Sequence, residues 1–117
     1  MHMTGTLDDS PVGDTKATER RVPFDHIPAV ADEFLVIFQG GDHLIFSGRG
    51  LMGGPLGGAG NPAMDPTFQM LIQQSTLAFW DAYLKSDGIA RKWLQNGGCK
   101  TMLGPYAALE LKPALNR

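Results

Sequence analysis

The stretch from Phe34 to His43 decides the fold of this chain, and it reads Phe-Leu-Val-Ile-Phe-Gln-Gly-Gly-Asp-His. A short, unbroken apolar run that ends in glycines is typical of a strand buried on both faces, as in a parallel sheet. We expect this strand to cover about Phe34 to Gln39. In open α/β sheets, chemistry lies just beyond the carboxyl ends of the strands. There, His43 would be able to exchange protons near neutral pH, and Asp42 is expected to shape the turn before it.

The composition narrows the class of protein. The 117 residues are enough for one domain, 1–117, with a modest core. A net charge of -2 gives no reason to expect nucleic acid or an anionic membrane as a partner. No apolar run approaches the roughly 20 residues of a membrane helix, and no leader peptide is visible. A single cysteine, Cys99, excludes an internal disulfide framework and leaves the compartment open.

The remaining elements follow from periodicity and turn residues. Residues 1–5 look like the tail of a strand, followed by a polar turn over 6–11; because a domain rarely begins inside its own sheet, this start hints at truncation. We expect a short helix over 14–21, an irregular stretch over 22–31, a glycine-rich loop over 47–62, helices over 65–85 and 88–96, and a short strand over 107–111. The longer helix carries a second apolar stripe, for which a second neighbour is expected, formed by Met70, Leu77, Trp80 and Leu84.

Asp8, Asp9 and His43 form the main candidate site. Each of the two strand ends is followed by a polar turn, one with carboxylates and one with an imidazole. If the strands are neighbours, a carboxylate there would hold the imidazole in one tautomer. The pattern alone favours the structural alternative, a turn aspartate and a capping histidine. None of the four serines lies in a Gly-x-Ser-x-Gly turn between a strand and a helix, so no nucleophile is recognised.

Cofactor and metal sites are not predicted. Gly48 to Gly53 matches Gly-x-Gly-x-x-Gly, but further glycines and prolines follow where a dinucleotide fingerprint requires a helix. A flexible flap beside His43 is the better interpretation of this loop. The histidines His2, His26 and His43 share no spacing typical of metal ligands.

Several segments together resemble a known family. They are Met3-Thr-Gly-Thr-Leu-Asp-Asp-Ser-Pro11, Arg21-Val-Pro-Phe24, Gly40-Gly-Asp-His-Leu-Ile-Phe-Ser-Gly48, Thr76-Leu-Ala-Phe-Trp-Asp-Ala-Tyr-Leu-Lys85 and Trp93-Leu94. In series they resemble the C-terminal part of α/β-hydrolases of the dienelactone hydrolase and polyester depolymerase-like esterase group. The most specific piece is Gly-Gly-Asp-His, followed by the helix that contains Phe-Trp-Asp-Ala-Tyr-Leu.

The resemblance implies an α/β fold: a partial α/β-hydrolase sheet of about two parallel strands, a long C-terminal helix and a glycine-rich loop. It implies that His43 is the general base of a serine carboxylic-ester hydrolase and Asp8 its acid, with Asp9 as the alternative. The nucleophile and oxyanion hole of that family lie in an N-terminal half that is absent here. The chain is therefore expected to be inactive alone, as a fragment or as half of a split enzyme.

A rival interpretation assigns the chain to a different class, a non-catalytic interaction module. An exposed strand edge and the second apolar stripe would then bind a partner chain or a second copy. Both interpretations allow a homo-oligomer, and the first also allows a complementing N-terminal half.

Overall fold

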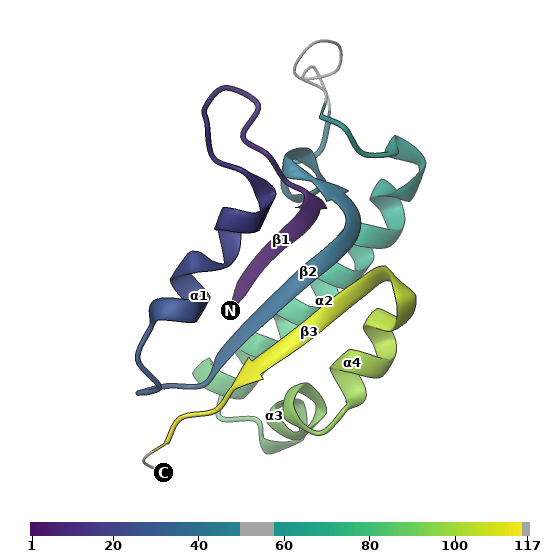
Figure 1. Ribbon diagram of the computed structural model, residues 1–117. Helices are drawn as coiled ribbons and strands as arrows, with labels where there is room; N and C mark the ends of the chain where they lie inside the picture. The colour runs from purple at the N-terminus through teal and green to yellow at the C-terminus, as the bar shows by residue number, and fades with distance from the viewer. Residues whose placement is uncertain (50–57, 116–117) are drawn as a thin grey trace.

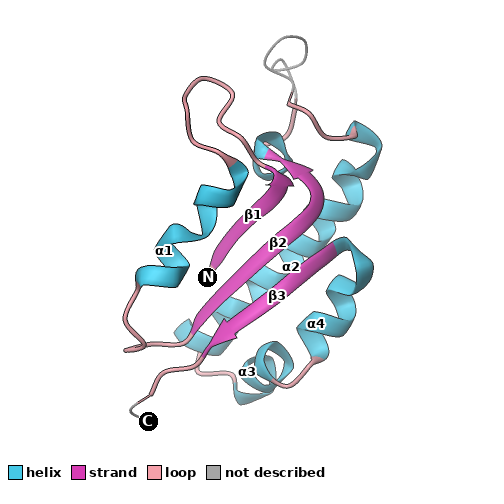
Figure 2. Cartoon of the chain, viewed as in Figure 1, coloured by secondary structure: helices cyan, strands magenta, loops and turns pink. Residues whose placement is uncertain are grey.

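The computed structural model describes residues 1–49 and 58–115, and the fold is mixed α/β. Its centre is a three-stranded sheet in the order β1-β2-β3 (Figures 1 and 2), with β1 at His2–Leu7, β2 at Glu33–Asp42 and β3 at Ala107–Lys112. β1 and β2 are parallel, as predicted, whereas β3 lies antiparallel to β2. The expected sheet of about two parallel strands therefore gains a third strand of opposite direction.

β2 is the central strand, and its burial explains the apolar run in its sequence. Phe34, Leu35, Val36 and Phe38 are all fully buried, although successive side chains of a strand point to opposite faces. The strand continues to Asp42, three residues past the predicted end at Gln39. It does so because β1 keeps pairing with it, from His2 opposite Leu35 to Leu7 opposite Asp42, across a register shift after Gly5.

Two glycines let the ends of β1 and β2 approach each other closely. A Cβ atom on Gly5 would lie 2.1 Å from the carbonyl oxygen of Gly41, closer than any real contact. Only glycine therefore fits at position 5 without moving the strands apart. The loops that follow β1 and β2 consequently leave the sheet side by side.

Helices cover one face of the sheet (Figure 1) and have the bounds α2 Asp65–Leu84, α3 Gly88–Gln95 and α4 Gly98–Leu103. α2 confirms the long helix predicted over 65–85, and its N-cap is Met64. α3 is capped by the Asp87 side chain, which accepts from the backbone N–H groups of Ile89 and Ala90. α4 was not predicted: Gly97, with a φ of 102°, separates it from α3.

The opposite face is covered by a short segment that contains a 3-10 helix at Ala17–Arg21 and α1 at Val22–His26. The Arg21 guanidinium donates to the Glu110 carboxylate at 2.8 Å, and the Lys112 ammonium donates to the carbonyl oxygens of Phe24 and Ile27. These contacts attach the segment to β3, on the other side of the sheet from β1. The expected helix over 14–21 and irregular stretch over 22–31 were partly wrong. Pro23 lies in the first turn of α1, where its missing N–H is not needed.

Asp32, just before β2, joins the helices to the far end of the sheet. Its carboxylate accepts hydrogen bonds from the Tyr83 hydroxyl at 2.6 Å, the Gln95 amide at 2.9 Å and the backbone N–H of Ala114 at 3.0 Å. The Arg91 guanidinium lies 3.2 Å from the same carboxylate. This polar cluster lies at the opposite end of β2 from His43.

The second apolar stripe on α2 is open to solvent. Its members are between 52 and 74 % exposed: Met70, Leu77, Trp80 and Leu84. The second neighbour predicted for this stripe is thus not supplied by residues 1–49 or 58–115. Across these same ranges no helix is both long and apolar enough to span a membrane.

Candidate functional site

Asp8 and His43 meet at the carboxyl ends of β1 and β2. Asp8 directly follows β1, and His43 directly follows β2 and begins a 3-10 helix, His43–Phe46. The His43 Nδ1 atom lies 2.8 Å from the Asp8 Oδ1 atom. Because a carboxylate only accepts, the neutral form of the ring makes this contact with its proton on Nδ1, which leaves Nε2 as an acceptor. The predicted contact between these two side chains is confirmed, whereas a catalytic role for it stays a prediction.

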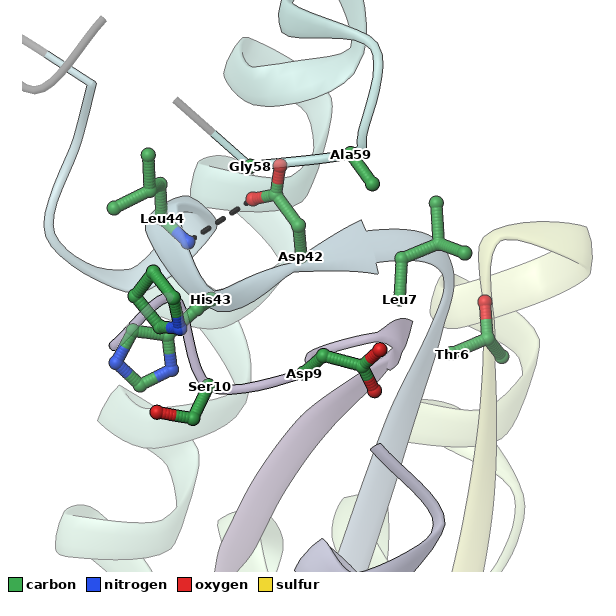
Figure 3. Close-up of a pocket in the computed structure, with 10 residues that line it drawn as sticks. Thr6, Leu7, Asp9, Ser10, Asp42, His43, Leu44, Gly58 and Ala59 are labelled. Carbon is green, nitrogen blue, oxygen red and sulfur yellow. Dashed lines mark hydrogen bonds between the residues drawn. The ribbon is translucent and has the colours of Figure 1, made fainter. Parts of the chain in front are cut away.

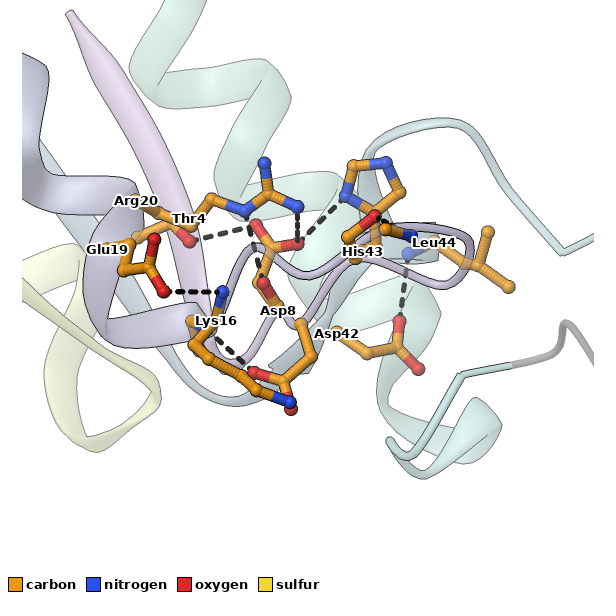
Figure 4. A network of polar contacts seen from close by, with 12 residues as sticks. Thr4, Asp8, Lys16, Glu19, Arg20, Asp42, His43 and Leu44 are labelled. Carbon is orange, nitrogen blue, oxygen red and sulfur yellow. Dashed lines mark hydrogen bonds and ion pairs between the residues drawn. The ribbon is translucent and has the colours of Figure 1, made fainter.

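Asp8 is held firmly by its surroundings (Figure 4). The residue is only 4 % exposed, and the Thr4 hydroxyl donates to its Oδ2 atom at 2.8 Å. Arg20 reaches it twice: Nε donates to the Asp8 carbonyl oxygen at 3.1 Å, and Nη2 lies 3.6 Å from Oδ1. The Asp8 backbone N–H closes a turn onto the Gly5 carbonyl at 3.1 Å. The Asp8 carboxylate, carbonyl and N–H group thus all have partners besides the imidazole.

Asp9, the alternative acid, has a different role. Its Oδ1 atom accepts a hydrogen bond from the backbone N–H of Ala17 at 2.7 Å, which ties the turn after β1 to the start of the 3-10 helix. The structure thus brings Asp8 to His43 and engages Asp9 elsewhere.

Asp42 fixes the turn at His43, as predicted. It is 1 % exposed, and it accepts from the backbone N–H groups of Leu44 at 3.0 Å and Gly60 at 2.9 Å. The Arg49 guanidinium donates to it at 2.8 Å. Burial favours the protonated form of this carboxyl, but the Arg49 guanidinium and the two N–H groups outweigh burial and lower the pKa of Asp42.

Arg49 joins Asp42 to the start of α2. Its Nε and Nη2 atoms donate to the two carboxylate oxygens of Asp65 at 2.7 and 3.0 Å, and its Nη1 atom donates to Asp42. Sequence reasoning missed Arg49, Arg20 and Thr4 as parts of the site. Thr4 and Asp8, four residues apart across the end of a strand, gave a weak signal. Arg49 gave none, because Asp42 and Asp65 lie 7 and 16 residues away from it in sequence.

A pocket of about 290 Å³ opens beside His43 (Figure 3), lined by Thr6, Leu7, Asp9, Ser10, Pro11, Asp42, His43, Leu44, Gly58 and Ala59. The His43 side chain is 47 % exposed, whereas the Asp8 side chain is 6 % exposed. The imidazole is therefore reachable from the pocket, and its carboxylate partner is shielded. Gly58 and Ala59 belong to the predicted flap, of which residues 50–57 lie outside the described residues.

The four serines lie in loops and turns or on a helix. Ser10 lines the pocket, but its hydroxyl accepts from the backbone N–H of Gly13 at 2.9 Å. Ser75 is buried against Cys99, and Ser47 lies 3.5 Å from the Gly48 carbonyl. Ser86 has a positive φ of 57° between α2 and α3. None of these positions has the strand-to-helix turn of a nucleophile elbow.

The other sequence predictions concern the remaining histidines, metal ligands and the glycine-rich loop. His2 contacts the Glu33 carboxylate at 2.8 Å, at the opposite end of the sheet from His43. Over residues 1–49 and 58–115, no cluster of three or more histidine, cysteine or acidic side chains has the geometry of a metal site. The Gly-x-Gly-x-x-Gly segment lies outside the described residues, apart from Gly48 and Arg49.

No protein-family model, curated protein or solved structure matches this chain. The resemblance to α/β-hydrolases therefore stays a prediction from the residues quoted above.

Proposed function

We propose that this chain supplies the general base and the acid of a serine carboxylic-ester hydrolase, with His43 as the base and Asp8 as the acid. One observation carries the proposal: the 2.8 Å contact between the His43 Nδ1 and Asp8 Oδ1 atoms, with the imidazole open to a pocket and the carboxylate buried. A Ser-His-Asp triad requires this arrangement of its acid and base, a buried and hydrogen-bonded carboxylate behind an accessible imidazole.

The proposed chemistry assigns each group one task. The His43 Nε2 atom takes the proton of a serine hydroxyl while the serine oxygen attacks the ester carbonyl carbon. Asp8 keeps the ring in the required tautomer and stabilises the imidazolium. The imidazolium then gives its proton to the departing alcohol as the ester C–O bond breaks, which leaves an acyl-enzyme. Water, deprotonated by the same nitrogen, releases the carboxylic acid and regenerates the serine.

The serine and the oxyanion hole belong, in this proposal, to a complementing half of the sheet. The four serines of this chain are engaged elsewhere or lack the required turn, so the chain alone should not form an acyl-enzyme. β1 is an outer strand of the sheet within the described residues. In this proposal its free edge joins the complementing half, because an unpaired strand edge readily accepts another strand.

The test joins this chain to a complementing N-terminal half that carries Gly-x-Ser-x-Gly. We expect a fluorophosphonate probe to label that serine and the assembly to hydrolyse a short-chain aryl ester. His43→Ala should lower kcat by about 10⁶-fold, and Asp8→Asn by about 10⁴-fold.

Asp14→Asn is the matched control, because it removes the same charge from an exposed aspartate outside the pocket lining and should leave kcat unchanged. Full activity in the His43→Ala assembly would refute the proposed base. Ester turnover by the chain alone, abolished by His43→Ala, would show that this chain contains its own nucleophile and would contradict its assignment as half of a site.

A second candidate function is that of a dimerising or partner-binding module. The observation in its favour is the apolar stripe of α2, whose four members are more than half exposed. Leu77→Glu with Trp80→Glu should lower the sedimentation mass if copies associate through this stripe, whereas Lys85→Glu, at the exposed end of the helix, should not. A wild-type chain that stays monomeric at high concentration would count against association with itself.

A further inference from the structure

Arg49 connects the end of β2 to the start of α2 and, through Asp42, to the loop at Gly60. Its guanidinium donates to Asp42 at the end of β2 and to both oxygens of Asp65 at the start of α2. Asp42 in turn accepts from the backbone of Gly60, in the loop that borders the pocket. The Arg49 side chain is largely buried, at 14 % exposure, so these charge-assisted bonds are shielded from solvent.

The Leu44 backbone N–H donates to the Asp42 carboxylate, and this hydrogen bond links the network to the turn that contains His43. Asp42 and Leu44 flank His43 in sequence, and the 3.0 Å bond between them closes the turn on which His43 sits. A turn held in this way fixes the φ and ψ angles of His43 and therefore the direction of its side chain. Without Arg49, one buried oxygen of Asp42 would lose its charged partner, and that is a costly arrangement.

Two glycines of the loop that borders the pocket, Gly58 and Gly60, lie very close to the Asp42 carboxylate. A Cβ atom on Gly58 would lie 2.3 Å from the Asp42 Oδ2 atom, and one on Gly60 would lie 2.9 Å from the same atom. The loop therefore packs directly on the carboxylate that Arg49 holds. A shift of Asp42 would disturb both the wall of the pocket and the turn at His43.

We propose that Arg49 is a positioning residue, which holds Asp42 so that the turn at His43 directs the imidazole onto Asp8. It does not touch the imidazole or Asp8 in the contacts described, and it acts through the Asp42 carboxylate. This inference rests on the proposed function, because the direction of the ring matters for catalysis only if His43 is the base. Its test therefore reads the state of the ring directly and needs no substrate.

The experiment records ¹⁵N NMR spectra of the imidazole of His43 in the full chain, at a pH where the ring is neutral. In the wild-type chain we expect one tautomer, protonated at Nδ1, with a strongly deshielded Nδ1 proton. In Arg49→Met we expect that proton signal to be lost and the ring to become a mixture of tautomers, as in free imidazole. Arg49→Lys, which cannot donate to both carboxylates in the same fork, should give an intermediate spectrum.

Arg91→Met is the matched control, because Arg91 also pairs with a buried carboxylate, that of Asp32, but at the far end of β2. This variant should lose stability and keep the wild-type His43 spectrum. If Arg49→Met does not fold, the comparison of Arg49→Lys with the wild type decides the question.

An unchanged tautomer in folded Arg49→Met or Arg49→Lys would overturn the positioning role and leave the proposed function standing. A wild-type ring protonated mainly at Nε2 would instead contradict the acid and base pair itself, and the positioning role with it.

Discussion

At the scale of single residues, the buried carboxylates differ in which hydrogen-bond donors surround them. Asp8, Asp32 and Asp42 are all buried, and each is surrounded by hydrogen-bond donors. Asp8 is the one whose donors include an exposed imidazole. Sequence patterns pointed to Asp8, Asp9 and His43 because all three follow predicted strands, and the family resemblance singled out Asp8. They could not identify Thr4, Arg20 or Arg49, since a donor to a carboxylate can come from any element that the fold brings near.

The pKa of Asp42 predicts how stability depends on pH. Despite burial, its donors hold the pKa in the folded chain below the value of about 3.9 for an unfolded aspartate. The folded state therefore binds this proton less readily than the unfolded state does. The stabilisation from Asp42 is complete above about pH 5 and is lost as the pH falls through the native pKa.

We expect Asp42→Asn to be less stable near neutral pH and to lose less of its remaining stability between about pH 5 and pH 3 than the wild type. Urea titrations at several pH values measure both effects. Asp9→Asn, which removes the same charge from an exposed position, serves as the comparison. Parallel pH profiles for the wild type and Asp42→Asn would show that Asp42 does not contribute to acid unfolding.

At the scale of elements, the sequence predicted the strands and helices that have a strong local pattern. It did not predict the features that depend on contacts between distant residues. The apolar run of β2 and the 3.6-residue period of α2 predicted both elements, because burial on two faces or one face leaves a clear signature. The direction of β3 was not predictable, since an edge strand of six residues carries no signal of its partner's direction. α1 and α4 are short, at five and six residues, and were missed because tertiary contacts stabilise them more than their own sequence does.

Two glycine substitutions test the contact between β1 and β2. Gly5→Ala would place a Cβ atom 2.1 Å from the Gly41 carbonyl oxygen, whereas Gly88→Ala, at the start of α3, meets nothing within 4 Å. We expect the first to cost at least about 1–3 kcal/mol of unfolding free energy and to weaken the deshielded His43 proton signal. The second should be neutral or stabilising. Thermal or urea unfolding compares them, and equal stabilities would show that the strands adjust without strain.

At the scale of the whole molecule, one core joins the sheet to the helices on one face. Phe34, Val36 and Phe38 of β2 pack with Phe68 and Leu71 of α2 and with the buried side chains of α4. The apolar stripe on the outer side of α2 takes no part in this core. The sequence predicted that α2 needs neighbours on two sides, and within the described residues the structure supplies the inner one.

Cys99 of α4 reports on the integrity of this core. Its side chain is fully buried, and burial raises the pKa of its thiol, although the contact with the Ser75 hydroxyl lowers it slightly. Both the burial and the raised pKa disfavour the reactive thiolate. We expect labelling by a disulfide reagent to be at least about 10³-fold slower in the native chain than in urea. Rapid labelling without denaturant would show that α4 opens independently of the sheet.

The close approach of Gly5 to Gly41 has a consequence for how such a site can vary. Main-chain atoms set the spacing between these two strand ends, so this spacing does not depend on side chains such as Leu7, Pro11 and Ala59. Those pocket residues could therefore be exchanged to admit ligands of other shapes, while the contact between Asp8 and His43 keeps its geometry.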